Sequence, residues 1–170
     1  REKELTRQQD DLARMIRELP AVPVEVDYSF DGPDGVEGLA DLFAGKSQLV
    51  VYHFMFGADW QEGCKSCSLL ADHFDGALKH LPHRDAAFVA ASTASQETVQ
   101  RFRNRMGWKF KWVSCVGPEF NRDFGVSFTA EPQDYTYNFR RQTGTPMTEL
   151  PGISVFRRDG NGAVFHTYSS

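Results

Sequence analysis

Two cysteines separated by two residues, Cys64 and Cys67, are the side chains of this sequence best suited to chemistry. An apolar segment rich in β-branched and aromatic residues, 48–56, precedes them, and residues 57–63 join it to them as a loop. After the cysteines, apolar residues recur at the spacing of one helix face, namely Leu70, Phe74, Ala77, Leu78 and Leu81. A cysteine pair of this spacing, where a buried strand passes into a helix, is typical of a dithiol redox site.

The start of a helix favours a thiolate, because its unpaired N–H groups and the helix dipole attract negative charge. We therefore predict that Cys64 is the nucleophile and that Cys67, one turn later, resolves a mixed disulfide formed at Cys64. Lys65 adds a cation that favours the thiolate, whereas the nearby acids Asp59 and Glu62 oppose it. The sequence leaves the net direction of the Cys64 pKa open.

Two other uses of the cysteines stay open at this point. They could pack as small apolar side chains, or they could bind a metal. A structural zinc ion needs two further ligands, and the sequence has no second C-x-x-C pair to supply them. Cu(I) is the alternative metal, since soft thiolates with a histidine suit that ion. We predict no metal and no cofactor.

Several residues near the cysteines have two interpretations. Trp60 either forms an apolar wall beside the thiols, where a substrate would bind, or anchors the loop in the core. Glu62 either relays a proton or is a solvated acid. His53, inside the expected strand, is predicted to be a hydrogen-bonded core residue, and Cys115 a buried inert thiol. His166 faces either the site or solvent, because strand alternation does not decide between them.

The composition indicates one globular domain spanning residues 1–170. Hydrophobic residues make up 41% of the chain, which includes 14 Phe, so a packed core is expected. A net charge of −4 with scattered basic residues argues against a nucleic-acid partner, and no apolar run reaches the roughly 20 residues that span a membrane. Three cysteines do not form a disulfide scaffold, so we expect a cytoplasmic protein. The chain opens at Arg1 rather than Met, which leaves room for a preceding leader.

The remaining patterns predict a mixed sheet flanked by helices, an α/β fold. A half-buried strand is expected at 24–30, a turn at 31–35, a short helix at 38–43, strands at 86–91 and 112–116, a helix from Ser95 to Gly107, and a hairpin of 152–159 with 163–169. Residues 129–150 form a long insert without periodicity before that final hairpin. It is either a lid over the thiols or a mobile surface segment.

The N-terminal segment, residues 1–19, predicts an amphipathic helix over 2–18. Its apolar side is formed by Leu5, Leu12, Met15, Ile16 and Leu19. The sheet needs apolar cover on both faces, and this helix could supply it to its own sheet or to that of a neighbour. We therefore expect a homodimer with the helix at the contact.

The overall order of elements is similar to that of thioredoxins, and the entry to the central strand resembles that of peroxiredoxins. More specifically, nearly the whole chain closely resembles a bacterial family, the domain of unknown function 899. The resemblance implies a thioredoxin-like fold, and family members are sometimes labelled dithiol-disulfide isomerases. The stretches that carry it are YHFMFGADWQEGCKSCS at 52–68, RMGW at 105–108, FNRDFGVSF at 120–128 and SVFRRDGNGAVFHTYS at 154–169.

Three positions depart from these relatives. Thioredoxins have Trp directly before the first cysteine, whereas Gln61, Glu62 and Gly63 lie between Trp60 and Cys64 here. Peroxiredoxins have a peroxide-binding Thr three residues before theirs, and Gln61 stands in its place. A thioredoxin fold also presents a cis-proline opposite the dithiol, for which Pro151 is the candidate and Pro146 the alternative. Pro151 is thereby predicted to contact substrate.

Residues and resemblance together predict a thiol–disulfide oxidoreductase that uses Cys64 and Cys67 on protein or small-molecule disulfides. A cellular thiol would be its reductant. A thiol peroxidase that reduces hydroperoxides is one alternative. A Cu(I)-binding protein, or a non-catalytic binding module built on the same fold, is the other.

Overall fold

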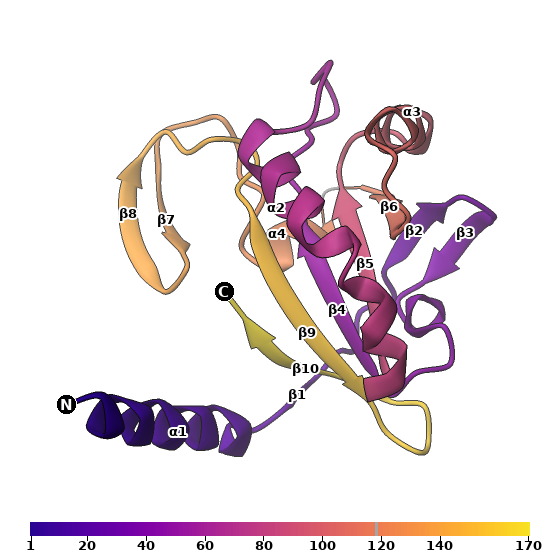
Figure 1. The fold of residues 1–170 in the computed structure, drawn as a ribbon. Coiled ribbons are helices and arrows are strands. Elements are labelled where there is room, and N and C mark those ends of the chain that lie inside the picture. The colour runs from indigo at the N-terminus through magenta and orange to yellow at the C-terminus, as the bar shows by residue number, and fades with distance from the viewer. Residues whose placement is uncertain (118) are drawn as a thin grey trace.

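An eight-stranded mixed β-sheet forms the centre of the protein, and helices cover both of its faces (Figure 1). The computed structural model describes residues 1–117 and 119–170. The strand order is β1-β10-β9-β4-β5-β6-β2-β3, and β7 and β8 form a separate pair. This confirms the predicted α/β class and its mixed central sheet.

The bounds of the elements are as follows. The helices are α1 (Glu2–Glu18), α2 (Lys65–Asp75), α3 (Gln96–Met106) and α4 (Glu119–Asp123), with 3₁₀ helices at Asp41–Phe43 and Leu78–Arg84. The strands are β1 (Val22–Pro23), β2 (Ser29–Gly32), β3 (Gly35–Gly38), β4 (Gln48–His53), β5 (Ala86–Ser92), β6 (Lys111–Cys115), β7 (Gln133–Tyr137), β8 (Arg140–Gly144), β9 (Gly152–Arg158) and β10 (Val164–Ser169).

The middle of the sheet positions the cysteines. Strands β4, β5 and β6 are parallel, and β9 lies antiparallel on the other side of β4. Successive residues of a strand point to opposite faces. Val51 of β4 accordingly packs in the core cluster that includes α4, while Tyr52 packs in the cluster that includes α2 and α3. The chain leaves the carboxyl end of β4, forms a loop and enters α2 at the cysteines.

Helix α3 confirms its prediction from local signals. The Oγ of Ser95 accepts a hydrogen bond from the Thr98 N–H at the start of the helix. The helix ends at Gly107, whose φ of 75° is a left-handed conformation that suits glycine. Val99 and Phe102 are buried, as their spacing predicts.

Helix α2 is rotated relative to the prediction. Leu70 was expected on its buried face, but 51% of this residue is exposed, and that prediction is wrong. The buried face instead begins with Cys67 and Ala71. Phe74 packs partly buried against the same cluster, as does Leu78 of the 3₁₀ helix that follows. Cys67 therefore lies against the sheet, and Leu69 and Leu70 face solvent beside it.

The strand expected at 24–30 is much shorter and begins later. β2 starts at Ser29 and continues into the residues that were expected to form the turn, which tightens to Pro33-Asp34. Val24 instead donates its N–H to the carbonyl of Val164 at 2.9 Å. The half-buried pattern of this segment thus reflects two separate contacts, one near β10 and one beside β6.

The insert 129–150 was predicted to be irregular, but it contains the antiparallel pair β7 and β8. Asn138 and Phe139 connect the strands with positive φ values of 46° and 62°. The hydroxyl of Tyr137 donates a 2.7 Å hydrogen bond to the carbonyl of Pro151, which ties the base of the hairpin to the start of β9. The hairpin stands beside the sheet rather than across α2 (Figure 1).

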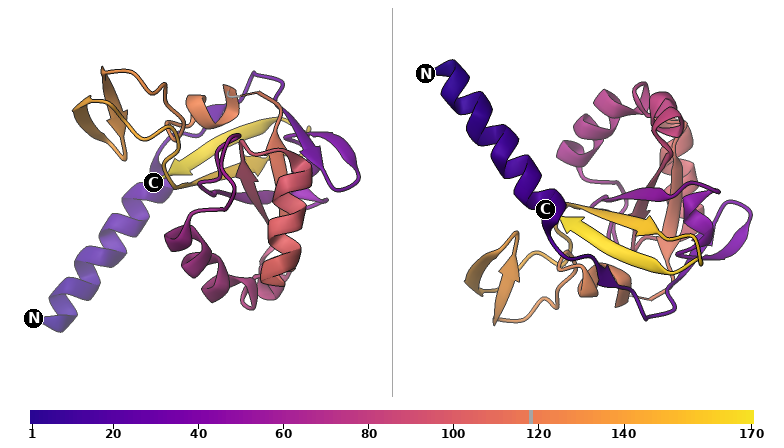
Figure 2. Two further views of the ribbon diagram at one scale, coloured as in Figure 1. Left: turned by 90° about the horizontal axis from the view of Figure 1, so that it is seen from above. Right: turned by 90° about the horizontal axis from the view of Figure 1, so that it is seen from below.

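Helix α1 confirms the predicted N-terminal helix, but it packs on no face of its own sheet. None of its residues is buried, and it projects from the body of the protein in both views of Figure 2. Its apolar residues Leu5, Leu12 and Met15 are each more than half exposed. No helix among the described residues combines the length and apolar character needed to cross a bilayer.

Candidate dithiol site

Cys64 is held by its backbone at the junction of loop and helix. It is the N-cap residue of α2, with extended backbone angles. Its N–H donates to the carbonyl of Met55 at 3.0 Å, and its own carbonyl accepts the N–H and the Oγ of Ser68, both at 2.9 Å. The residue before it, Gly63, lies so close to the rings of Phe54 and Phe102 that a Cβ would clash.

The Cys64 thiol is partly exposed and polarised toward the thiolate. Its Sγ lies 3.4 Å from the Oγ of Ser66. Partial burial alone would raise the pKa of Cys64, but hydrogen bonds from the Ser66 hydroxyl and from the backbone N–H groups of Cys67 and Ser66 outweigh it. The pKa of Cys64 is thus lowered, which settles the direction that the sequence left open.

Cys67 is the complementary thiol. Only 2% of it is exposed, and burial raises its pKa to about 11, although the Tyr52 hydroxyl and the Met55 backbone act in the opposite direction. The two thiols are therefore shifted in opposite directions, and Cys67 stays protonated at neutral pH.

The charges around the site come from the preceding loop and from α3. Arg105 pairs with Glu62 through a 2.8 Å contact between Nη1 and Oε1, and its guanidinium lies over the Phe102 ring. The hydrogen bond from Arg105 lowers the pKa of Glu62, which keeps the carboxylate ionised and argues against a proton relay. The pair also reduces the repulsion that Glu62 would exert on a Cys64 thiolate. A groove of about 320 Å³ lies beside it, between α2 and α3.

Trp60 and Pro151, the predicted substrate contacts, occupy different surroundings. Trp60 is half-buried and packs against the core cluster that includes Cys67. Pro151 immediately precedes β9. No cis peptide bond occurs among the described residues, so the expected cis-proline is wrong for Pro151 and for Pro146. Pro151 leads directly into β9, and its carbonyl accepts the hydrogen bond from the Tyr137 hydroxyl.

The sequence did not reveal a polar network buried on the opposite face of β4. His53 bonds through Nδ1 to Asn121 Oδ1 and through Nε2 to Ser154 Oγ, both at 2.9 Å. Beyond Asn121, the carboxylate of Glu149 accepts hydrogen bonds from Ser127 and Thr93. The hydrogen-bonded partners in this network are 22 to 101 residues apart along the chain, so no local spacing signals them. The predicted core role of His53 is confirmed.

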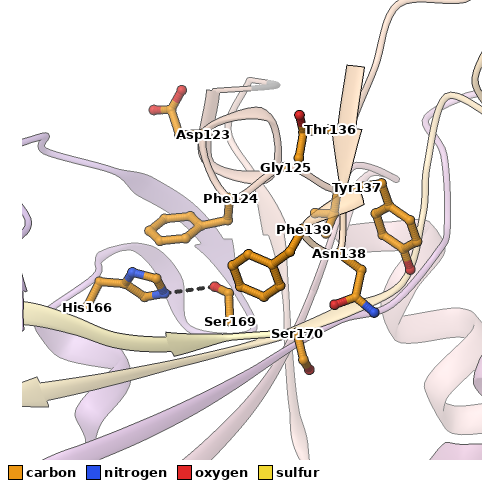
Figure 3. A pocket seen from close by; sticks show the side chains of 11 residues that line it. Asp123, Phe124, Gly125, Thr136, Tyr137, Asn138, Phe139, His166, Ser169 and Ser170 are labelled. Atoms are coloured by element: carbon orange, nitrogen blue, oxygen red, sulfur yellow. Dashed lines mark hydrogen bonds between the residues drawn. The ribbon is translucent and has the colours of Figure 1, made fainter. Parts of the chain in front are cut away.

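The network reaches a second cavity at the far end of β10. Ser169 links Ser154 to Nε2 of His166, at 3.0 and 2.8 Å. His166 lines this cavity of about 310 Å³, opposite Phe139 and beside Phe124 (Figure 3). His166 thus faces a pocket that is lined by neither cysteine.

Cys115 and the metal alternatives can be placed as well. Cys115 is buried, and burial together with the Glu149 carboxylate raises its pKa, as expected for an inert thiol. Among the residues that the structure describes, no group of three or more His, Cys, Asp or Glu side chains is arranged to hold a metal ion. Among those described residues, Cys64 and Cys67 therefore have no third protein ligand with which to bind a metal ion.

The comparisons with known proteins agree with the fold. The family model for a bacterial protein of unknown function, DUF899, matches residues 1–170. The chain belongs to this family. The DUF899 match confirms the resemblance found in the sequence, whereas no curated protein matches the chain.

Solved structures similar to this DUF899 protein are thioredoxin-like. A cysteine-to-serine variant of PrxQ from Xylella fastidiosa has a TM-score of 0.57 at 12% identity and covers 87% of this chain and 85% of its own. The peroxidoxin BcpB from Mycobacterium tuberculosis gives 0.54 at 16%, with 85% and 80% covered. A Chlorobium tepidum protein provisionally named thiol:disulfide interchange protein DsbE gives 0.51 at 16%, with 89% and 85% covered. These likenesses confirm the predicted thioredoxin-like fold.

Proposed function

We propose that this protein is a thiol–disulfide oxidoreductase with Cys64 as nucleophile and Cys67 as resolving thiol. The observation that carries the proposal is the contrast between the two sulfurs at the start of α2. The partly exposed sulfur of Cys64 has a lowered pKa, and the buried sulfur of Cys67, a turn later, has a raised pKa. That contrast orders the two steps of a dithiol exchange.

In the first step the Cys64 thiolate attacks one sulfur of a substrate disulfide. A bond forms between Cys64 and that sulfur, the substrate disulfide breaks, and the other substrate sulfur leaves as a thiolate that takes up a proton. In the second step Cys67 loses its proton and attacks Cys64, which releases the remaining substrate thiol and leaves a Cys64–Cys67 disulfide. A cellular dithiol then reduces that disulfide by the reverse exchange.

Trp60 and Pro151 are proposed as substrate contacts on different grounds. Trp60 packs with Cys67 and remains partly exposed, so it can offer an apolar wall to an approaching disulfide. Two observations support Pro151. Its carbonyl accepts a hydrogen bond from the Tyr137 hydroxyl, and the pKa of Tyr137 is raised by burial and by Cys67. We propose action in the reducing cytoplasm, since three cysteines, an odd number, do not suggest the disulfide scaffold of a secreted protein.

The bridge itself is the first expected outcome. Protein treated with oxidised dithiothreitol or with hydrogen peroxide, then alkylated, should contain one intramolecular disulfide, Cys64–Cys67. Cys115 should stay reduced, because it is 6% exposed and its thiol is disfavoured as a thiolate. Peptide mass spectrometry under non-reducing conditions measures this. A bridge to Cys115, or three alkylated thiols after oxidation, would contradict the assignment.

Hydroperoxide reduction is the second candidate, favoured by the likeness of the fold to PrxQ and BcpB. Here Cys64 would attack the peroxide, which becomes water or an alcohol, and the resulting sulfenic acid would condense with the Cys67 thiol to give the disulfide and water. Formation of the bridge with peroxide much faster than with a disulfide oxidant would select this function. The reverse order of rates would select thiol–disulfide exchange.

We also propose a homodimer in which α1 of one copy packs on the other. Its apolar residues are exposed, and a groove of about 460 Å³ at its base is lined by Ile16, Leu19, Phe139 and Tyr168. Deletion of residues 1–19 should convert the dimer to a monomer in multi-angle light scattering. The double substitution Leu12→Glu with Met15→Glu should do the same and leave the helix in place. A full-length chain that is monomeric at high concentration would contradict the proposal.

A further inference from the structure

Tyr52 has a buried hydroxyl with no evident structural use. It lies on β4 beneath α2, only 2% exposed, with its ring edge-on to Phe54 at 5.9 Å and to Phe74 at 5.3 Å between centroids. Its hydroxyl makes no hydrogen bond of ordinary geometry with any described residue. A buried, unpaired hydroxyl costs stability, and phenylalanine would fill the same space without that cost.

The group next to this hydroxyl is the thiol of Cys67. Both residues belong to the core cluster under α2, and the presence of the Tyr52 hydroxyl lowers the pKa of Cys67 against the larger effect of burial. Burial and the neighbouring thiol raise the pKa of Tyr52 itself, so the tyrosine keeps its proton and can donate it in a hydrogen bond. The other hydroxyl nearby, on Tyr137, is already used by the carbonyl of Pro151.

We propose that Tyr52 is a positioning residue for the resolving step, in which its hydroxyl donates a hydrogen bond to the sulfur of Cys67 as that thiol becomes a thiolate. The inference rests on the proposed dithiol function. Cys67 gives its proton to solvent, its sulfur attacks Cys64, and the bond from Cys64 to the substrate sulfur breaks. Tyr52 takes no proton and forms no bond; it stabilises the charge that the apolar site would otherwise exclude.

The hydrogen bond explains why a polar residue is kept in this apolar cluster. In the resting thiol state the hydroxyl has a poor partner, because a thiol is a weak acceptor. A thiolate is a far better one. The stability lost in the resting protein is therefore recovered when Cys67 ionises, so the interaction acts on the rate of the second step rather than on the fold.

The experiment separates the two steps with 5,5′-dithiobis(2-nitrobenzoate), whose coloured thiolate is followed by absorbance. Attack by Cys64 releases one equivalent in a phase that depends on reagent concentration. Attack by Cys67 on the mixed disulfide releases a second equivalent in a phase that does not. In Tyr52→Phe the second phase should slow about 10-fold near neutral pH, and its rate profile should move to higher pH by about one unit, while the first phase is unchanged.

Tyr28→Phe is the matched control, because it removes a buried tyrosine hydroxyl outside the cluster around Cys67. That hydroxyl donates a 2.7 Å hydrogen bond to Asp123, so the variant should melt at a lower temperature yet show both phases as in the wild type. Tyr52→Phe should show the opposite combination, an unchanged or higher melting temperature with a slow second phase. A purely structural role for Tyr52 would not produce that combination.

The outcomes distinguish the inference from the function on which it rests. If the wild type releases two equivalents and Tyr52→Phe has the same second-phase profile, the role of Tyr52 is overturned and the dithiol function stands. If the wild type releases only one equivalent, Cys67 does not resolve, and both are overturned.

Discussion

Cys64→Ser should abolish turnover with any disulfide or hydroperoxide substrate. Its sulfur is partly exposed and has the lowered pKa of the pair, whereas the Cys67 thiol is buried and stays protonated at neutral pH. Activity should fall to background, because a serine hydroxyl cannot replace a thiolate in exchange. An insulin-reduction or peroxide-consumption assay with dithiothreitol as reductant measures the loss.

Cys67→Ser should behave differently and trap the intermediate. Attack by Cys64 is intact, so the variant should accumulate a mixed disulfide with its substrate, visible as an added mass that dithiothreitol removes. Cys115→Ala is the control and should keep turnover, since this thiol lies in the opposite core cluster. A dead Cys67→Ser together with a Cys64→Ser that traps adducts would reverse the assigned roles.

Acid should destabilise the protein mainly through His53. Burial lowers the pKa of this histidine from 6.5 to about 4, and the hydrogen bond to Asn121 only partly opposes the shift. Protonation is therefore easier in the unfolded chain. The stabilising contribution is complete above about pH 6.5 and is lost as the pH falls toward 4, which amounts to about 3 kcal/mol.

His53→Gln tests this, because an amide can keep both polar contacts without titrating. In urea unfolding at pH 7, 5.5 and 4, the stability difference between wild type and variant should change by about 3 kcal/mol in favour of the variant. Glu149 faces His53 through Asn121, and His166 faces it through Ser169 and Ser154; both are present in each protein. His83→Gln, an exposed histidine, should change nothing. Parallel curves for wild type and His53→Gln would contradict the prediction.

The parts of the fold that local signals specify were predictable. The central strands, the Ser95 and Gly107 ends of α3 and the final hairpin all lie within a few residues of their predicted positions. The cysteines were equally accessible, because their spacing and the start of α2 are adjacent in the sequence. The directions of their pKa shifts were not predictable, because the sequence leaves the balance of Lys65 against Asp59 and Glu62 open.

The errors arose where distant contacts decide the outcome. Helix α2 carries two overlapping apolar faces, and burial of Cys67 and Ala71 against the sheet selects the one that excludes Leu70. The hairpin β7–β8 lacks apolar alternation and has no glycine in its turn. Contacts such as the Phe128 and Tyr135 rings, 5.0 Å apart, accompany its pairing. No local pattern encodes such contacts.

The backbone of Cys64 is fixed from both sides, by Met55 on the strand side and by Ser68 on the helix side. Formation of a disulfide would therefore require little backbone movement at Cys64. Its sulfur would move chiefly by rotation about the Cα–Cβ bond. Rotation of one side chain requires almost no reorganisation of the surrounding structure. In the proposed exchange reaction, the site would therefore change between open and bridged forms without a rearrangement of the sheet beneath it.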